Sequence, residues 1–88
     1  MFRQWRFQSA VKREARRRYR RGEITRTQLK KAQSLTYEQA GVVLRVTQVK
    51  SGEYPILEAI WAFVVEHWDE ILKAVLLIVP MLLDERDD

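Results

Sequence analysis

The strongest pattern of apolar positions in the chain runs over residues 54–83. Steps of four and three residues along this stretch meet large apolar side chains at Leu57, Trp61, Val64, Trp68, Ile71, Val75, Ile78 and Leu82. A mean period of about 3.5 residues is typical of a helix that buries one stripe against other helices. The pattern therefore predicts one long helix, amphipathic as far as Lys73 and apolar on every side from residue 74 to residue 83. We call the eight apolar positions the seam.

The seam allows two interpretations: packing on other helices of the same chain, or self-association of several copies. It contains no polar residue that would set a register, and its mixture of aromatic and β-branched side chains selects no oligomer number. A chain of 88 residues without cysteine has no disulfide to support a small core. We therefore favour a homo-oligomer with the seam as its interface.

Residues 1–21 are expected to form a first helix that is rich in arginine. Trp5, Val11, Ala15 and Tyr19 follow helical spacing and make a thin apolar stripe. Gly22 stands directly after this helix, where a residue without Cβ adopts left-handed backbone angles and ends the helix.

A second helix over residues 26–34 is predicted from its start signals. Thr25 is a good N-cap, and Gln28 stands three residues later, as a capping box requires. Ile24 and Leu29 occupy the two positions of a hydrophobic staple around the cap. The first two helices should therefore form a hairpin that turns at residues 22–24.

This hairpin resembles a known family. The motif Gly22-Glu23-Ile24-Thr25 followed by Leu29 is similar to that of SHOCT-type hairpins, short helical modules found in many bacterial and phage proteins. The resemblance covers residues 11–35. It implies oligomerisation or nucleic-acid association and carries no catalytic residue. More loosely, the small size, the arginine-rich start and the apolar C-terminal segment resemble accessory proteins of small bacteriophages.

Residues 36–53 allow two interpretations. Thr36 with Gln39 repeats the capping-box signal of a helix, whereas residues 42–49 are rich in the β-branched side chains that strands prefer. A single strand needs a partner strand, and no other segment offers one. We therefore favour a helix over residues 37–50 that tolerates Gly41. Its expected inward positions are Ala40, Val43, Leu44 and Thr47.

These elements predict an all-α, oligomeric protein in three parts. A basic helical hairpin covers residues 1–35, a third helix and linker cover residues 36–53, and the long C-terminal helix with an acidic tail covers residues 54–88. Pro55 suits the first turn of the long helix, and Pro80 should kink or end it near its far end.

Charge is distributed unevenly along the chain. Residues 1–35 hold twelve Lys and Arg against two Glu, a balance of +10, and residues 36–88 hold four against ten Asp and Glu, a balance of −6. Such a basic segment is typical of proteins that bind nucleic acid or anionic lipid, and it also occurs as a solvated face. We favour the phosphate backbone of DNA or RNA, bound without recognition of base sequence. One guanidinium group can bind two phosphate oxygens through two parallel hydrogen bonds.

The candidate nucleic-acid-binding residues are Arg6, Lys12, Arg13, Arg16, Arg17, Arg18, Tyr19, Arg20, Arg21, Lys30 and Lys31. Trp5, Phe7 and Tyr19 are interleaved with the cations, and aromatic rings in such a position can stack on unpaired bases.

Features of an enzyme are scarce in this sequence. It has no cysteine, no nucleophile–base pair and no glycine-rich phosphate loop. His67 and Glu70 lie one helical turn apart, which is half of a carboxylate–histidine metal site, but a histidine beside solvated acids explains the pair more simply. We therefore expect a non-enzymatic protein without a metal or cofactor.

Two other functions stay open. In one, residues 56–83 insert into a membrane as an oligomer, as in holin- or lysis-type proteins, although six ionisable residues lie in this span. In the other, the chain is a minor structural subunit of a larger assembly such as a virion. The expected location is accordingly the cytoplasm or a virion, with the inner membrane as the alternative.

Overall fold

A computed structural model describes residues 2–80, with the side chains of residues 2, 3 and 57 left undescribed. Over this range the protein is all-α and contains no strand. The elements in order are α1 (Phe2–Arg20), α2 (Arg26–Gln33), α3 (Tyr37–Ser51), the short 3-10 helix η1 (Leu57–Ala59), α4 (Ile60–Glu66) and α5 (Trp68–Ile78).

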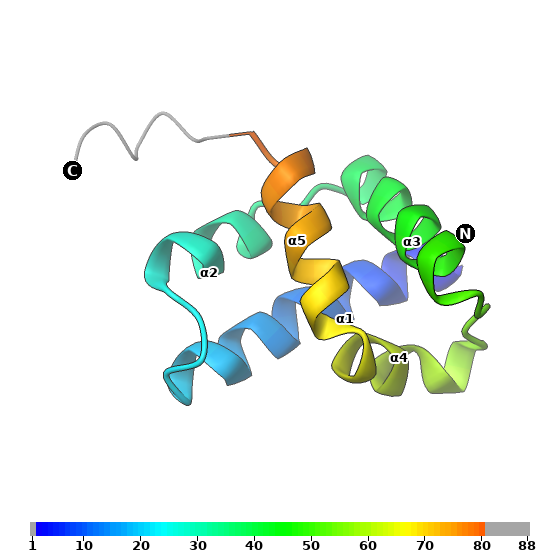
Figure 1. The fold of residues 1–88 in the computed structure, drawn as a ribbon, viewed down its shortest axis with the longest axis horizontal. Coiled ribbons are helices and arrows are strands. Elements are labelled where there is room, and N and C mark those ends of the chain that lie inside the picture. Colours follow the sequence, from blue (N-terminus) through cyan, green and yellow to red (C-terminus); the bar gives the residue numbers. More distant parts are fainter. Residues whose placement is uncertain (1, 81–88) are drawn as a thin grey trace.

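The long helix α1 is the centre of the arrangement. It packs against α2, α3 and α4, while α5 packs against α2 and α3 (Figure 1). In that view α5 crosses α1 with α2 on one side and α3 on the other. A core of this kind buries the inward stripe of every helix within one chain.

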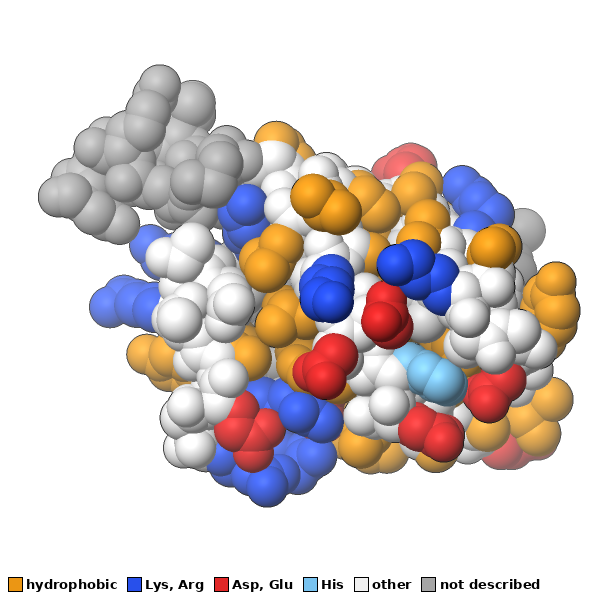
Figure 2. Space-filling model, in the orientation of Figure 1, with side chains coloured by type: hydrophobic (Ala, Val, Ile, Leu, Met, Phe, Trp, Pro, Cys, Tyr) orange, Lys and Arg blue, Asp and Glu red, His pale blue; other side chains and the backbone are white. Residues whose placement is uncertain are grey.

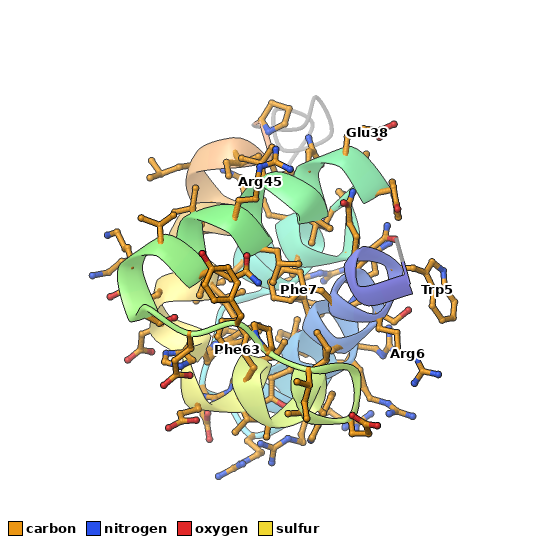
Figure 3. All side chains as sticks on the ribbon, turned by 90° about the vertical axis from the view of Figure 1, so that its right-hand side faces the viewer. Trp5, Arg6, Phe7, Glu38, Arg45 and Phe63 are labelled. Atoms are coloured by element: carbon orange, nitrogen blue, oxygen red, sulfur yellow. The ribbon has the colours of Figure 1, made fainter. Side chains whose placement is uncertain are left out.

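The inward face of α1 differs from the predicted stripe. Phe7, Val11 and Ala15 are fully buried, whereas Trp5 is 58% exposed and Tyr19 is 39% exposed. Figure 3 shows Phe7 directed into the helices and Trp5 directed away from them. The prediction that Trp5 and Tyr19 continue the stripe is therefore wrong, because the buried face is rotated toward Phe7.

The turn between α1 and α2 confirms its sequence signals. Gly22 has a φ of +76°, and its N–H donates to the Tyr19 carbonyl at 3.0 Å, while the N–H of Glu23 donates to the Arg18 carbonyl at 2.9 Å. These two bonds form a Schellman motif. The Thr25 hydroxyl then accepts from the N–H of Gln28, whose side chain accepts from the N–H of Thr25, which completes the capping box.

The third element is a helix, as predicted. A second capping box joins Thr36 and Gln39 at its start, and Gly52 with a φ of +72° ends it. The four predicted inward positions are all buried: Ala40, Val43, Leu44 and Thr47.

The prediction of one long C-terminal helix is wrong. The segment divides into η1, α4 and α5, and α5 leaves α4 in a different direction (Figure 1). His67 marks the division with φ −108° and ψ 28°, outside regular helical angles. α5 ends at Ile78, and Val79 is extended before Pro80, as the residue before a proline prefers. Within residues 2–80 no helix has the length and apolar character needed to cross a membrane.

Most side chains of the seam are covered by helices of the same chain. Val64, Ile71 and Val75 are fully buried, and Trp68 is 3% exposed. Trp61 and Ile78 are partly buried against the same core. The predicted interface residues Leu57 and Leu82 lie outside the described side chains. At its four innermost positions the seam is thus covered by helices of its own chain, and self-association through the C-terminal segment stays a prediction.

Candidate nucleic-acid interface

The cations of α1 divide into an exposed group and an engaged group. Arg6, Arg13, Arg16 and Arg20 are all exposed. Their spacing of seven, three and four residues places them within about 80° of one another on a helix of 3.6 residues per turn. None of the four forms an ion pair with a carboxylate among the described residues. We call these four side chains the arginine row.

The engaged group surrounds Glu14, the one acid of α1. Its side chain is fully buried, and it receives a two-bond contact from Arg17, with both N···O distances at 2.9 Å. Arg18 adds a third bond at 2.6 Å from its Nε. These charge-assisted bonds satisfy both carboxylate oxygens of a buried acid, and they occupy two of the cations that the sequence assigns to nucleic acid.

The protonation of Glu14 follows from these contacts. Burial by itself raises the pKa of the carboxyl group, but the hydrogen bonds and charges of Arg17 and Arg18 outweigh it and hold the pKa of Glu14 below its ordinary value. The same hydrogen bonds raise the pKa of Arg17 above its ordinary value. Glu14 is therefore an ionised structural group rather than a proton donor.

Arg18 is fixed by further contacts on the inward side of α1. Its guanidinium lies 3.2 Å from a carboxylate oxygen of Glu23, and the guanidinium carbon lies over the Trp68 ring, 5.3 Å from the ring centroid. Arg21 also pairs with Glu23, at 3.0 Å. Figure 2 shows Lys and Arg side chains gathered at the edge of the molecule near the α1–α2 turn. Much of this positive charge is already matched within the chain.

The lysines of the predicted set are less exposed than the arginine row. Lys31 is 7% exposed, and its ammonium group donates to the Leu76 carbonyl of α5 at 3.4 Å. A cation in the last turn of a helix is favourable, because the carbonyl dipoles point toward it. Lys12 and Lys30 are half-buried. Lys31 therefore joins α2 to α5 and is the most buried cation of the predicted set.

A groove of about 380 Å³ lies beside the arginine row, between α1 and the segment formed by η1 and α4. Arg6, Arg13, Arg16 and Trp5 line it from α1, and Glu58 and Trp61 line it from the other side. The Arg13 guanidinium lies over the Trp61 ring, with its carbon 5.5 Å from the ring centroid. The groove thus combines three guanidinium groups with two indoles.

The aromatic residues predicted to stack on bases also divide into exposed and buried ones. Trp5 is exposed beside Arg6, and both point away from the helices (Figure 3). Tyr19 is partly exposed near the end of α1, whereas Phe7 is buried and offers no ring to a base, contrary to the prediction. Trp61, which the sequence assigns to the seam, lines the groove instead.

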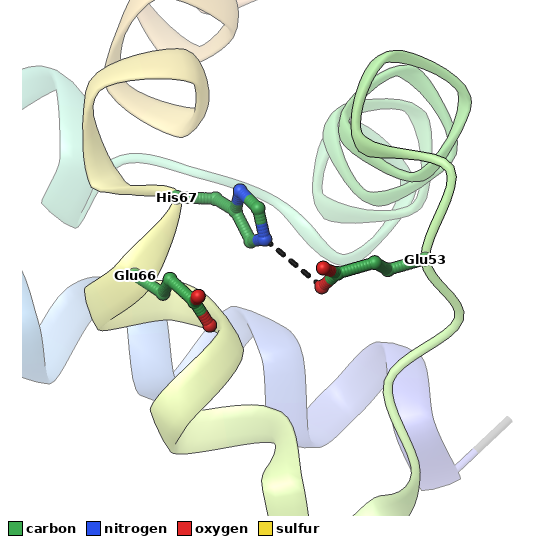
Figure 4. A group of neighbouring side chains, drawn as sticks. All are labelled: Glu53, Glu66 and His67. Carbon is green, nitrogen blue, oxygen red and sulfur yellow. Dashed lines mark hydrogen bonds and ion pairs between the residues drawn. The ribbon is translucent and has the colours of Figure 1, made fainter.

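His67 lies beside an acid other than Glu70. His67 contacts Glu53 through its Nε2 at 3.0 Å, and Glu66 lies beside them, so that donor atoms of the three are within 4.8 Å of one another (Figure 4). Glu70 pairs with Lys50 at 3.4 Å instead. One imidazole and two carboxylates make a donor set that divalent metals accept, and sequence spacing could not bring Glu53 into it.

The described residues thus place four of the eleven predicted nucleic-acid-binding residues in one row, and three of these line the groove. Comparisons with protein-family models, with curated proteins and with solved structures found no match to this chain.

Proposed function

We propose that this protein binds the phosphate backbone of nucleic acid through the arginine row of α1. The single observation that supports the proposal most strongly is the row itself: four exposed guanidinium groups on one face, none of which forms an ion pair with a carboxylate among the described residues. An internal ion-pair network would have used these cations, as it uses Arg17 and Arg18. Four unmatched guanidinium groups attract phosphates without reading sequence.

A nucleic acid suits the row better than an anionic membrane does. A helix that lies on a membrane surface inserts an apolar face into the lipid. The apolar face of α1 is already covered by the core, because Phe7, Val11 and Ala15 are fully buried. Charge attraction and the exposed Trp5 ring would remain for lipid, whereas nucleic acid offers phosphates to the whole row and rings to the indoles beside it.

The salt dependence of binding tests the proposal. The full chain is titrated into labelled single-stranded and duplex oligonucleotides at salt concentrations from about 50 to 200 mM. Four phosphate contacts predict that log K falls with log salt at a slope of about −3. The double variant Arg6→Gln/Arg20→Gln should weaken binding and reduce the magnitude of the slope by about 1.5.

A matched control removes the same charge elsewhere. Arg45→Gln/Lys73→Gln changes two exposed cations on α3 and α5, off the row, and should leave the slope close to that of the unchanged chain. An equal effect of both double variants would overturn the proposal, because net charge alone would then explain binding. So would the absence of binding to every oligonucleotide at about 50 mM salt, or binding to phosphatidylserine vesicles that nucleic acid does not displace.

A further inference from the structure

We infer that the groove beside the arginine row holds an unpaired base, so that the ligand is single-stranded nucleic acid rather than a duplex. The inference rests on the proposed function and names the class of nucleic acid that it takes. It follows from which groups face the groove, which groups lie outside it, and what a duplex can present to them.

The composition of the groove fits a base better than a phosphate. Glu58 stands in its lining, opposite the guanidinium groups, and a carboxylate repels a phosphate at close range. The same carboxylate accepts hydrogen bonds from the exocyclic amino groups of bases. Arg20 belongs to the row but not to the groove. Arg6, Arg13 and Arg16 belong to both the row and the groove, so a strand whose phosphates lie along the row brings a base to the groove.

Two indoles provide flat surfaces at this position. Trp5 is 58% exposed, a large apolar area to leave in water on a helix whose other side is buried. Trp61 lies across the groove beneath the Arg13 guanidinium, itself a planar group on which bases stack. A base that enters between Trp5 and this pair covers the part of the Trp5 ring that is exposed to water.

A duplex cannot use these surfaces. Its bases are stacked on one another inside the helix and present only their edges, whereas the bases of a single strand expose their faces. A duplex could still contact the row through phosphates. Selectivity for single strands should therefore depend on the indoles, and total affinity should depend on the arginines.

The test compares ligands that differ in their bases but share their phosphates. A labelled single strand of about 12 nucleotides, its duplex and the same strand with abasic sites at its centre are titrated with the full chain at low salt. We expect the single strand to bind more tightly than both other ligands. Trp5→Ala should weaken single-strand binding by roughly 5- to 100-fold and leave duplex binding unchanged, because stacking on one aromatic ring is lost.

Two further variants keep the test decisive. Trp5→Phe retains an aromatic ring and should restore much of the single-strand affinity. Tyr54→Ala removes another exposed aromatic side chain, in the loop after α3, and should have no effect. If Trp5→Ala leaves single-strand binding unchanged, or weakens both ligands equally, the base site is refuted. Loss of binding in Arg6→Gln/Arg20→Gln would in that case still uphold the proposed function, so the two failures are distinguishable.

Discussion

Glu14 shows how one buried acid decides which cations of α1 reach solvent. Its carboxylate is fully buried and holds Arg17 and Arg18, so the arginines three and four positions later turn inward. The arginines at positions 6, 13, 16 and 20 form no ion pair with a carboxylate in the described part of the chain, and they make up the exposed row. A sequence reading that treats the basic run as uniform cannot separate the two sets. The sequence signal that could have separated them is the spacing of Arg17 and Arg18, three and four residues after Glu14, at which side chains on a helix pair.

Replacing Glu14 should therefore destabilise the fold. Glu14→Gln leaves the guanidinium of Arg17 without its anion and that of Arg18 with Glu23 alone, and the free energy of unfolding should fall by about 1–3 kcal/mol. Denaturant unfolding of both chains at neutral pH measures the difference. Glu58→Gln, which changes an exposed carboxylate, should alter the same quantity by less than about 0.5 kcal/mol.

The pH dependence of stability tests the same contact, because the direction of the Glu14 pKa shift fixes the direction in which stability changes with pH. Because the folded state lowers the pKa of Glu14, its stabilising contribution is present above the ordinary value of 4.5 and is lost as pH falls through the folded pKa. The unchanged chain should therefore lose stability more steeply below about pH 4.5 than Glu14→Gln does. Parallel curves for the two chains would show that Glu14 is not the group that titrates.

At the scale of elements, the starts of α2 and α3 could be predicted from the sequence, because a capping box involves only residues three positions apart. Both capping boxes form as predicted, at Thr25 and at Thr36. The break between α4 and α5 at His67 could not be predicted in this way. No Gly or Pro marks it, and neither α4 nor α5 begins with a side-chain cap. The break instead lets α4 pack on α1 while α5 packs on α2 and α3, which is a tertiary requirement.

The caps should contribute measurably to stability. Thr36→Ala removes the side-chain acceptor of the Gln39 N–H at the start of α3, and the free energy of unfolding should fall by about 1 kcal/mol. Thr27→Ala is the matched control, because Thr27 is an exposed residue inside α2 and caps nothing. It should be neutral or slightly stabilising, since alanine has the higher helix propensity. Equal losses in both variants would argue against a capping role for Thr36.

At the scale of the whole molecule, the seam shows what a hydrophobic period does and does not specify. It correctly marks a stripe that must be buried, and its four innermost side chains are buried. It does not specify which chain supplies the covering surface, because the same 3.5-residue period serves a bundle and a coiled coil alike. The groove likewise could not be predicted from the sequence. Trp5 and Trp61 are 56 residues apart, and they line one groove because α1 packs on α4.

A mild change in the seam separates an intramolecular core from an interface. Ile71→Val removes one methylene from a fully buried side chain, and it should lower the free energy of unfolding by about 0.5–1.5 kcal/mol. The mass of the folded species in sedimentation should be the same as that of the unchanged chain, because Ile71 packs against its own chain. Leu77→Ala, at a position 85% exposed, should change stability by less than about 0.5 kcal/mol. If Ile71→Val instead shifts the folded chain to a smaller species without loss of stability, the seam joins separate copies and the intramolecular packing of α5 is wrong.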